Sequence, residues 1–362
     1  MSTPDSPAGG LGPVREAHRF DEAALGEFAR RHVPGFEGPL VVQQFEGGQS
    51  NPTFLLQTPG RQYILRKKPP GQLLPSAHAI EREYRILKAL EPTGVPVPKV
   101  HVLCEDPAVI GTPFYVMERV EGRIFRNPTM PEARSPDERR GIYLDMARVL
   151  ARIHKVDWKA AGLEGYGKTG NYMLRQIERW TAQYEATRTD TIDSMEKLIR
   201  WMPDNVPDAG HLTIAHGDYR LENLIIHPQE PHAVAVLDWE LSTLGHPLAD
   251  LAYCCMLYHL PPNPSSGNLG ASSGLMGTNF VGLGIPPEKD FISAYAAEMG
   301  DSGGVADYDF FVAFGMFRLA AIVQGVYKRG LDGNASSTKA ATYGPIVKFL
   351  ADAAMHQLKG RL

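Results

Sequence analysis

The chain has 362 residues, of which 43% are hydrophobic and 22% charged, so it is long enough for one large or two moderate globular domains with real cores. Its formal net charge is -4 and no segment interleaves basic with aromatic residues, which argues against a nucleic-acid partner. Only three cysteines occur, two of them adjacent, which excludes a disulfide scaffold and favours a reducing compartment. We therefore expect a cytoplasmic enzyme.

The opening residues are rich in proline and glycine and predict a flexible tail over 1–20. They lack the basic and apolar regions of a signal peptide. No stretch approaches the roughly 18 uninterrupted apolar residues of a membrane span, so we expect neither secretion nor a membrane partner. The sequence indicates no oligomeric state.

The next hundred residues contain several short runs in which apolar and polar residues alternate, as in a β-rich domain. The expected elements are a helix over 20–32, three strands within 40–68, a helix over 76–90 and two strands within 98–120. We therefore predict an N-terminal lobe over 21–120, built from a small sheet with one inserted helix.

The remainder, 121–362, has the pattern of a larger, mainly helical lobe. Ser135 as N-cap, Pro136 at the first helical position and Glu138 as the capping-box residue predict the start of a long helix. A second long and mostly apolar helix is expected over 308–329. The predicted fold class is α+β with two lobes.

A dense group of polar residues lies in "HGDYRLENLIIHP", residues 216–228. Asp218 and Asn223 precede a predicted strand, and Asp238 ends the strand that follows a short turn. A hairpin would bring these three side chains to one end, where carboxylate and amide oxygens suit Mg²⁺. Taken singly, each is explained as well by a turn or a helix cap.

The spacing of the three agrees with the protein-kinase pattern H-x-D-x-x-x-x-N followed by a metal-binding aspartate. In that chemistry Asn223 and Asp238 hold Mg²⁺ against the phosphates of ATP, while Asp218 accepts the proton of the attacking hydroxyl. We expect His216 to brace the loop without touching substrate.

The predicted lobe over 21–120 contains a candidate phosphate ligand. Glu83 lies on the apolar face of its helix, and a half-buried carboxylate needs a partner. Arg66 and Lys67 are adjacent on a strand, so their side chains point to opposite faces and only one of them can meet Glu83. Alignment with the kinase strand favours Arg66, whose fork could hold Glu83 and a phosphate together, but Lys67 remains an alternative.

Two glycine-rich segments are candidates for phosphate loops. Gly47, Gly48 and Ser50 would let backbone N–H groups approach the phosphates, although a simple hairpin turn explains them equally well. Residues 162–169, "GLEGYGKT", fit the P-loop pattern. A P-loop follows directly on a buried strand, whereas a predicted helix and a polar linker precede this one, so we expect only a connection there.

The run 216–228 and "VLDWELSTLGHPLADLAY" resemble the aminoglycoside phosphotransferase and choline kinase superfamily. "YILRKKPPGQLLPSAHAIEREYRIL" resembles more closely the kinase-like domains related to those fused to acyl-CoA dehydrogenases in animals. The resemblance covers roughly 25–350. It implies a two-lobed protein-kinase-like fold that binds ATP and Mg²⁺ and phosphorylates the hydroxyl of a small molecule.

The resemblance also implies roles for single residues. Asp218 would be the base, Asn223 and Asp238 the metal ligands, and Asp250 a support in the helical lobe. Main-chain groups from Glu118 to Val120 would meet adenine.

The acceptor is less clearly indicated. Over 291–362 there are six acidic and seven basic residues, which disfavours a polycation such as an aminoglycoside. Arg318 or Arg329 could meet a carboxylate or phosphate, and the resemblance suggests a hydroxy acid or hydroxyacyl-CoA. An aminoglycoside kinase, a choline-type kinase and a non-catalytic nucleotide-binding module are the alternatives.

Overall fold

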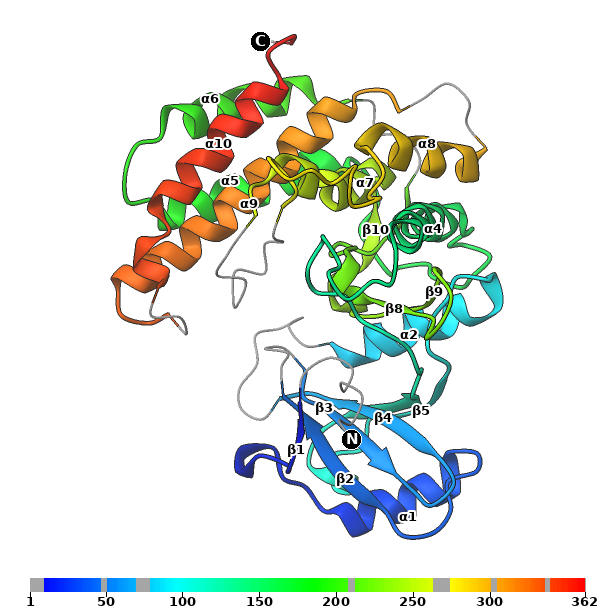
Figure 1. The fold of residues 1–362 in the computed structure, drawn as a ribbon. Helices are drawn as coiled ribbons and strands as arrows, with labels where there is room; N and C mark the ends of the chain where they lie inside the picture. The colour runs from blue at the N-terminus through cyan, green and yellow to red at the C-terminus, as the bar shows by residue number, and fades with distance from the viewer. Residues whose placement is uncertain are drawn as a thin grey trace. The chain divides into compact units, whose positions relative to one another are not determined.

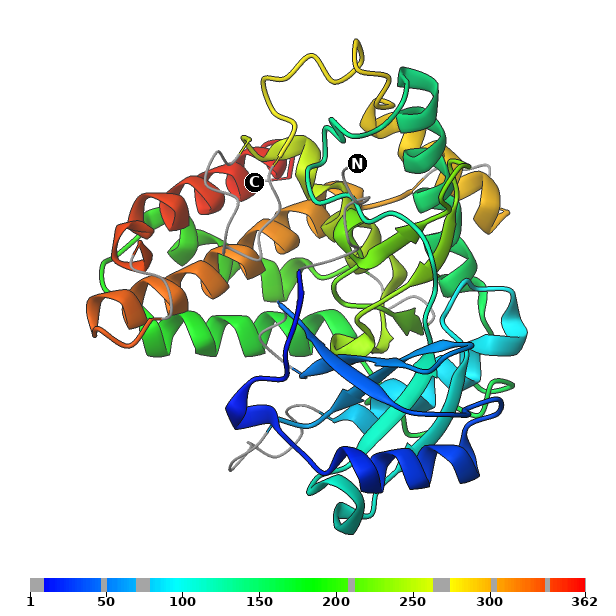
Figure 2. The ribbon, with the colours of Figure 1, turned by 60° about the horizontal axis from the view of Figure 1, so that its bottom comes forward.

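The computed structural model describes residues 10–46, 51–69, 79–207, 212–262, 274–300, 305–335 and 339–361. The chain divides into two compact units (Figures 1 and 2). The first unit comprises Met1–Phe125, Lys159–Leu163 and Leu221–Ser242, and the second comprises Arg126–Trp158, Glu164–Arg220 and Thr243–Leu362.

The first unit contains an antiparallel six-stranded sheet with the order β1-β2-β3-β4-β6-β5. Its strands are β1 (Leu11–Gly12), β2 (Val41–Phe45), β3 (Thr53–Gln57), β4 (Gln62–Lys67), β5 (Val100–Cys104) and β6 (Phe114–Glu118). Strand β1 lies inside the segment expected to be a tail, and its residue Leu11 pairs with Phe45 of β2. The two residues of β1 carry no alternating pattern long enough to predict a strand.

Helices cover both faces of this sheet (Figure 1). On one face α1 (Glu22–His32) and the short α3 (Pro107–Ile110) pack on a core that includes Phe54, Leu65 and Phe114. Helix α2 (Ile80–Leu90) packs against β5 and β6 on the other face. Because side chains alternate along a strand, neighbouring residues of β4 point to different helices.

A hairpin from the middle of the chain belongs to the first unit. Strand β8 (Leu224–Ile226) pairs with β9 (Ala233–Val236), flanked by the 3-10 turns η4 (Leu221–Asn223) and η5 (Trp239–Leu241). Arg123 bridges to Ile226, and a Cβ on Gly122 would lie 2.5 Å from the Ile226 carbonyl oxygen. Only glycine permits this approach, which joins the hairpin to the segment that follows β6.

The second unit is mainly helical. Its helices are α4 (Pro136–Lys155), α5 (Tyr172–Thr187), α6 (Asp193–Trp201), α7 (Pro247–Cys255), α8 (Glu288–Met299), α9 (Tyr308–Leu331) and α10 (Gly344–Gln357). Two short strands, β7 (Thr213–Ala215) and β10 (Thr243–Gly245), pair antiparallel. The predicted cap of α4 is confirmed, because the Glu138 N–H donates to Ser135 Oγ at 3.1 Å.

Helix α9 forms the centre of the second unit. It packs against α5, α7 and α10 and contributes Phe310, Phe314 and Phe317 to the core. Within the described residues α9 alone has the length and apolar composition to cross a membrane, yet 78% of its most apolar window is buried inside the fold. Such burial is typical of a core helix.

The P-loop-like segment does not have the structural context of a P-loop. It lies between α4 and α5, and the described residues 156–171 contain no strand. Gly162 and Gly165 both have positive φ, and the Lys168 carbonyl accepts a hydrogen bond from Arg175 Nη2. The segment is a connection into α5, as its sequence context predicts.

Candidate active site

In the first unit, Arg66 joins two carboxylates that are far apart in sequence. Its Nε lies 3.3 Å from Glu83 Oε2, and its Nη2 lies 3.5 Å from Asp238 Oδ1. The Arg66 side chain is 13% exposed and that of Glu83 is 1% exposed. Burial opposes the Arg66 charge, but Glu83, Tyr115 and Asp238 outweigh it and raise the pKa of Arg66 above its ordinary value.

Glu83 is held by neutral donors as well. Asn51 Nδ2 and the Tyr115 hydroxyl each donate to one of its carboxylate oxygens at 2.9 Å. Tyr115 stands directly opposite Arg66 in the β4–β6 pair. Burial, and then the Glu83 charge, raises the pKa of Tyr115, so its hydroxyl stays a donor. The buried carboxylate is therefore paired and hydrogen-bonded, as its burial requires.

Lys67 points to the other face of β4. It is buried, and its Nζ lies 5.5 Å from the centre of the Phe20 ring and 6.0 Å from that of Phe54. Burial lowers the pKa of Lys67. Of the two adjacent basic residues, Arg66 is therefore the one that shares a face with Glu83.

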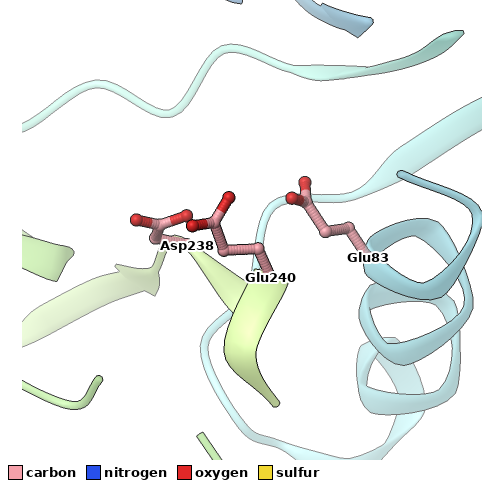
Figure 3. A group of neighbouring side chains, drawn as sticks. All are labelled: Glu83, Asp238 and Glu240. Carbon is pink, nitrogen blue, oxygen red and sulfur yellow. The ribbon is translucent and has the colours of Figure 1, made fainter. Parts of the chain in front are cut away.

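Asp238 and Glu240 supply two further carboxylates beside Glu83. Asp238 has a left-handed backbone (φ 65°, ψ 60°), which is uncommon for a residue with a side chain and tolerated best by Asn and Asp. It begins the turn η5 that presents Glu240 (Figure 3). Carboxylate oxygens of Glu83, Asp238 and Glu240 lie within 4.8 Å of one another. A group of hard oxygen ligands this close fits a Mg²⁺ ion.

Asn223 lies at the same end of the β8–β9 hairpin as Asp238. Its carbonyl accepts a hydrogen bond from the Leu237 N–H at 2.8 Å, next to Asp238 in the chain. The Asn223 residue is buried. The hairpin therefore brings Asn223 and Asp238 to one end. Asp218 belongs to the second unit, so its position beside these two residues stays a prediction.

In the second unit, Asp218 contacts a hydroxyl and a guanidinium. The Tyr253 hydroxyl donates to Asp218 Oδ1 at 2.7 Å, and Arg220 Nε lies 3.4 Å from Asp218 Oδ2. The Asp218 side chain is 17% exposed. A carboxylate that is fixed yet still reachable has the properties of a general base.

Asp250 holds the backbone that precedes Asp218. Its oxygens accept from the N–H of His216 at 2.5 Å and of Gly217 at 2.9 Å. Burial by itself would raise the pKa of Asp250, but His154, His216 and the Gly217 N–H outweigh it and lower that pKa. His216 is fully buried, and its Nδ1 accepts from the Asp218 N–H at 3.2 Å. Both residues therefore brace the loop.

Arg318 of α9 reaches the same loop. Its Nη2 donates to the Gly217 carbonyl at 3.2 Å, and its guanidinium carbon lies 5.4 Å from the Trp180 ring centre and 5.2 Å from that of Tyr253. Stacking on two rings stabilises an arginine charge. None of the ion pairs found within the described ranges involves Arg318.

The remaining predicted site residues are those of the glycine-rich loop and of the adenine contact. Gly47, Gly48 and Ser50 lie outside the described residues. The Glu118 N–H donates to the Lys99 carbonyl at 2.9 Å, so it is already used in the β5–β6 region. Val120 follows β6 and is half-buried. The adenine contact at Glu118 to Val120 stays a prediction.

Sequence reasoning missed Asn51, Tyr115, Glu240 and Tyr253. Tyr115 could have been found from strand pairing, because a partner opposite Arg66 must share its face. Glu240 stands two positions after Asp238, but its direction depends on the left-handed backbone of Asp238. Tyr253 lies 35 positions after Asp218, and no local pattern links the two.

Comparison with known proteins assigns this arrangement to a family. Residues 41–273 match the model of the phosphotransferase enzyme family. The chain is 46% identical over 343 residues to acyl-CoA dehydrogenase family member 10 of Mus musculus. That match covers 94% of this chain but only 31% of the mouse protein, so the chain spans less than a third of that relative's length.

Solved structures agree. A protein from Ralstonia eutropha, provisionally assigned as an aminoglycoside phosphotransferase, is 48% identical, with a TM-score of 0.84 over 94% of this chain and 99% of that one. An aminoglycoside phosphotransferase solved with AMP-PNP and hygromycin B is 15% identical, with a TM-score of 0.55 over 92% of this chain and 98% of its own. The predicted α+β kinase-like fold and the resemblance to this superfamily are confirmed.

Proposed function

Because the chain belongs to the phosphotransferase enzyme family, we propose that it transfers the γ-phosphate of ATP to the hydroxyl of a small, neutral or anionic acceptor. The observation that carries the proposal is Arg66, whose guanidinium contacts both Glu83 and Asp238. A basic strand residue paired to a helix glutamate, beside a metal-binding aspartate, is the phosphate-holding arrangement of kinases.

In this proposal Arg66 binds the α- and β-phosphates while Glu83 fixes its direction. A planar guanidinium can serve a carboxylate and a phosphate at once, which explains how arginine replaces the usual lysine. The hygromycin-bound relative was solved with AMP-PNP, which supports ATP as the nucleotide. Main-chain groups from Glu118 to Val120 are the proposed contacts of adenine, apart from the Glu118 N–H.

Asp238, Asn223 and Glu240 are the proposed ligands of Mg²⁺. A Mg²⁺ ion held by these residues would supply positive charge against the negative charge that develops on the phosphates during transfer. Their oxygen atoms fit the preference of Mg²⁺ for hard ligands. Arg66 lies close to the same carboxylates, so its charge compensates them before metal and nucleotide bind.

Asp218 is the proposed base. It accepts the proton of the acceptor hydroxyl as the oxygen of that hydroxyl attacks the γ-phosphorus, and ADP leaves. Its side chain is 17% exposed, so it is still accessible to a substrate hydroxyl. Phosphoryl transfer depends mainly on position and electrostatics, so a carboxylate that is held in place is well suited to this role.

Arg318 supports an acceptor with a negative group. It contacts Gly217, next to Asp218, and pairs with no carboxylate among the ion pairs of the described residues. A polycation would be repelled at this position. Relatives that include an acyl-CoA dehydrogenase family member make a hydroxy acid or a hydroxyacyl-CoA the acceptor class that we propose to test first.

The test compares acceptors that differ in charge. A hydroxy acid, its neutral methyl ester, a hydroxyacyl-CoA and an aminoglycoside are offered with MgATP, and phosphorylated product is measured. We expect transfer to the anionic acceptors, and a loss of about 10- to 100-fold in kcat/KM for them in Arg318→Gln. Lys348→Gln, which removes an exposed positive charge from α10 of the same unit, is the control. A preference for the aminoglycoside would refute the proposed acceptor class but would leave the proposed phosphotransfer activity intact.

A further inference from the structure

We infer that Tyr253 is a positioning residue that fixes the orientation of the Asp218 carboxylate for proton transfer. The inference rests on the proposed role of Asp218 as base. It depends on one contact, the 2.7 Å hydrogen bond from the Tyr253 hydroxyl to Asp218 Oδ1. Both residues belong to the second unit.

The contact limits how the carboxylate can turn. Asp218 Oδ1 accepts from Tyr253, and Oδ2 lies 3.4 Å from Arg220 Nε. The Asp218 backbone is also fixed, because its N–H donates to His216 Nδ1 at 3.2 Å. Because Oδ1 and Oδ2 both have partners, rotation about the last side-chain bond would break both of these contacts. The orientation of the carboxylate is therefore set.

Tyr253 is itself held rigidly. Its ring is stacked by the Arg318 guanidinium at 5.2 Å, and Arg318 also donates to the Gly217 carbonyl beside Asp218. The Trp180 ring contacts the same guanidinium at 5.4 Å. Arg318 thus contacts both Tyr253 and the loop that carries Asp218. A rigid support of this kind is what an accurately placed catalytic group requires.

The properties of the Tyr253 phenol fit a role in positioning Asp218 and not a role in relaying its proton. Burial, and then the Asp218 charge, raises the pKa of Tyr253 above its ordinary value. Its hydroxyl therefore remains protonated across the working pH range and donates throughout. The Tyr253 hydroxyl can therefore hold the Asp218 carboxylate by donating to it, without itself giving up a proton.

The test is Tyr253→Phe in the full chain, which keeps the ring and its stacking but removes the hydroxyl. We expect kcat to fall about tenfold with the KM for ATP unchanged. Because the lost hydrogen bond favoured the charged carboxylate, the acid limb of the pH–rate profile should move to higher pH. Tyr258→Phe is the control, because it removes a hydroxyl that donates to the Pro286 carbonyl at 3.0 Å.

A second readout needs no turnover. The carbon NMR signal of the Asp218 carboxyl is recorded at neutral pH in the wild type and in Tyr253→Phe, with Asp218→Asn identifying the signal. A displaced Asp218 signal in Tyr253→Phe supports the inference. An unchanged pH–rate profile and an unchanged carboxyl signal in a folded variant would overturn it. If the wild type transfers phosphate to no acceptor, the proposed function fails, while the NMR signal still shows whether the Tyr253 hydroxyl holds the Asp218 carboxylate.

Discussion

Arg66 and Glu83 form a buried ion pair, with Arg66 Nε 3.3 Å from Glu83 Oε2 and Glu83 1% exposed. Charges this deeply buried are costly unless they are paired and hydrogen-bonded. Asn51 and Tyr115 complete the set of donors to Glu83. The pair therefore contributes to two properties, the stability of the first unit and the binding of phosphate.

Removing the charge of Glu83 should destabilise the protein. Glu83→Gln leaves the Arg66 guanidinium without its buried counter-charge, at a cost of about 3 kcal/mol in the free energy of unfolding. Urea denaturation measures it. Glu81→Gln on the same helix is the control, because Glu81 pairs with Lys68 at a partly exposed position and should cost less than about 1 kcal/mol. Equal effects of the two changes would contradict the account.

Substitutions of the two adjacent basic residues of β4 should have different effects on the affinity for ATP. Arg66→Met is expected to weaken ATP binding by about tenfold or more, since it removes a charged contact to the phosphates. Lys67→Met should bind ATP as the wild type does, because Lys67 points toward Phe20 and Phe54. Titration calorimetry measures both. The opposite ranking would assign the phosphates to Lys67.

Glu240 should contribute to metal binding. Glu240→Gln removes one of three carboxylates whose oxygens lie within 4.8 Å of one another. We expect the Mg²⁺ concentration that gives half-maximal activity to rise several-fold, because a metal site weakens when its ligand charge falls. Glu230→Gln, an exposed change in the turn of the same hairpin, should leave it unaltered. An unaltered Mg²⁺ dependence in Glu240→Gln would remove Glu240 from the site.

The Asp250 carboxylate should make stability depend on pH. Its pKa in the folded protein is lowered, so it contributes stability that is present above its unfolded pKa and lost as the pH falls through its folded pKa. The difference in unfolding free energy between wild type and Asp250→Asn should be largest near neutral pH and shrink below about pH 4. Denaturation at several pH values measures this. A difference that is independent of pH would contradict the electrostatic explanation.

The first unit was largely predictable because its strands are long enough to alternate. Alternation on β4 showed that Arg66 and Lys67 face opposite ways, and helical spacing placed Glu83 on the buried face of α2. Strands β7 and β10 escaped prediction because three residues hold no period and no short turn joins them, as one joins the equally short β8 to β9. The membership of the β8–β9 hairpin in the first unit depends on long-range contacts such as Gly122 against Ile226.

The candidate site was predictable where a motif fixed the spacing and not elsewhere. Asp218, Asn223 and Asp238 follow a known order along the chain. Tyr253 and Arg318 reach the Asp218 loop from separate helices, and only the packing of α7 and α9 puts them there. The position of Glu240 depends on the left-handed backbone of Asp238, which no sequence pattern predicted.

The most direct test of the central claim is the transfer of labelled γ-phosphate from MgATP to a hydroxyacyl-CoA or hydroxy acid, with Asp218→Asn beside the wild type. The account predicts a labelled product whose rate of formation falls by about 10² to 10⁴ in the variant while ATP still binds. Equal rates in both proteins would contradict the role of Asp218 as base, and no labelled product from the wild type with either acceptor would contradict the proposed reaction.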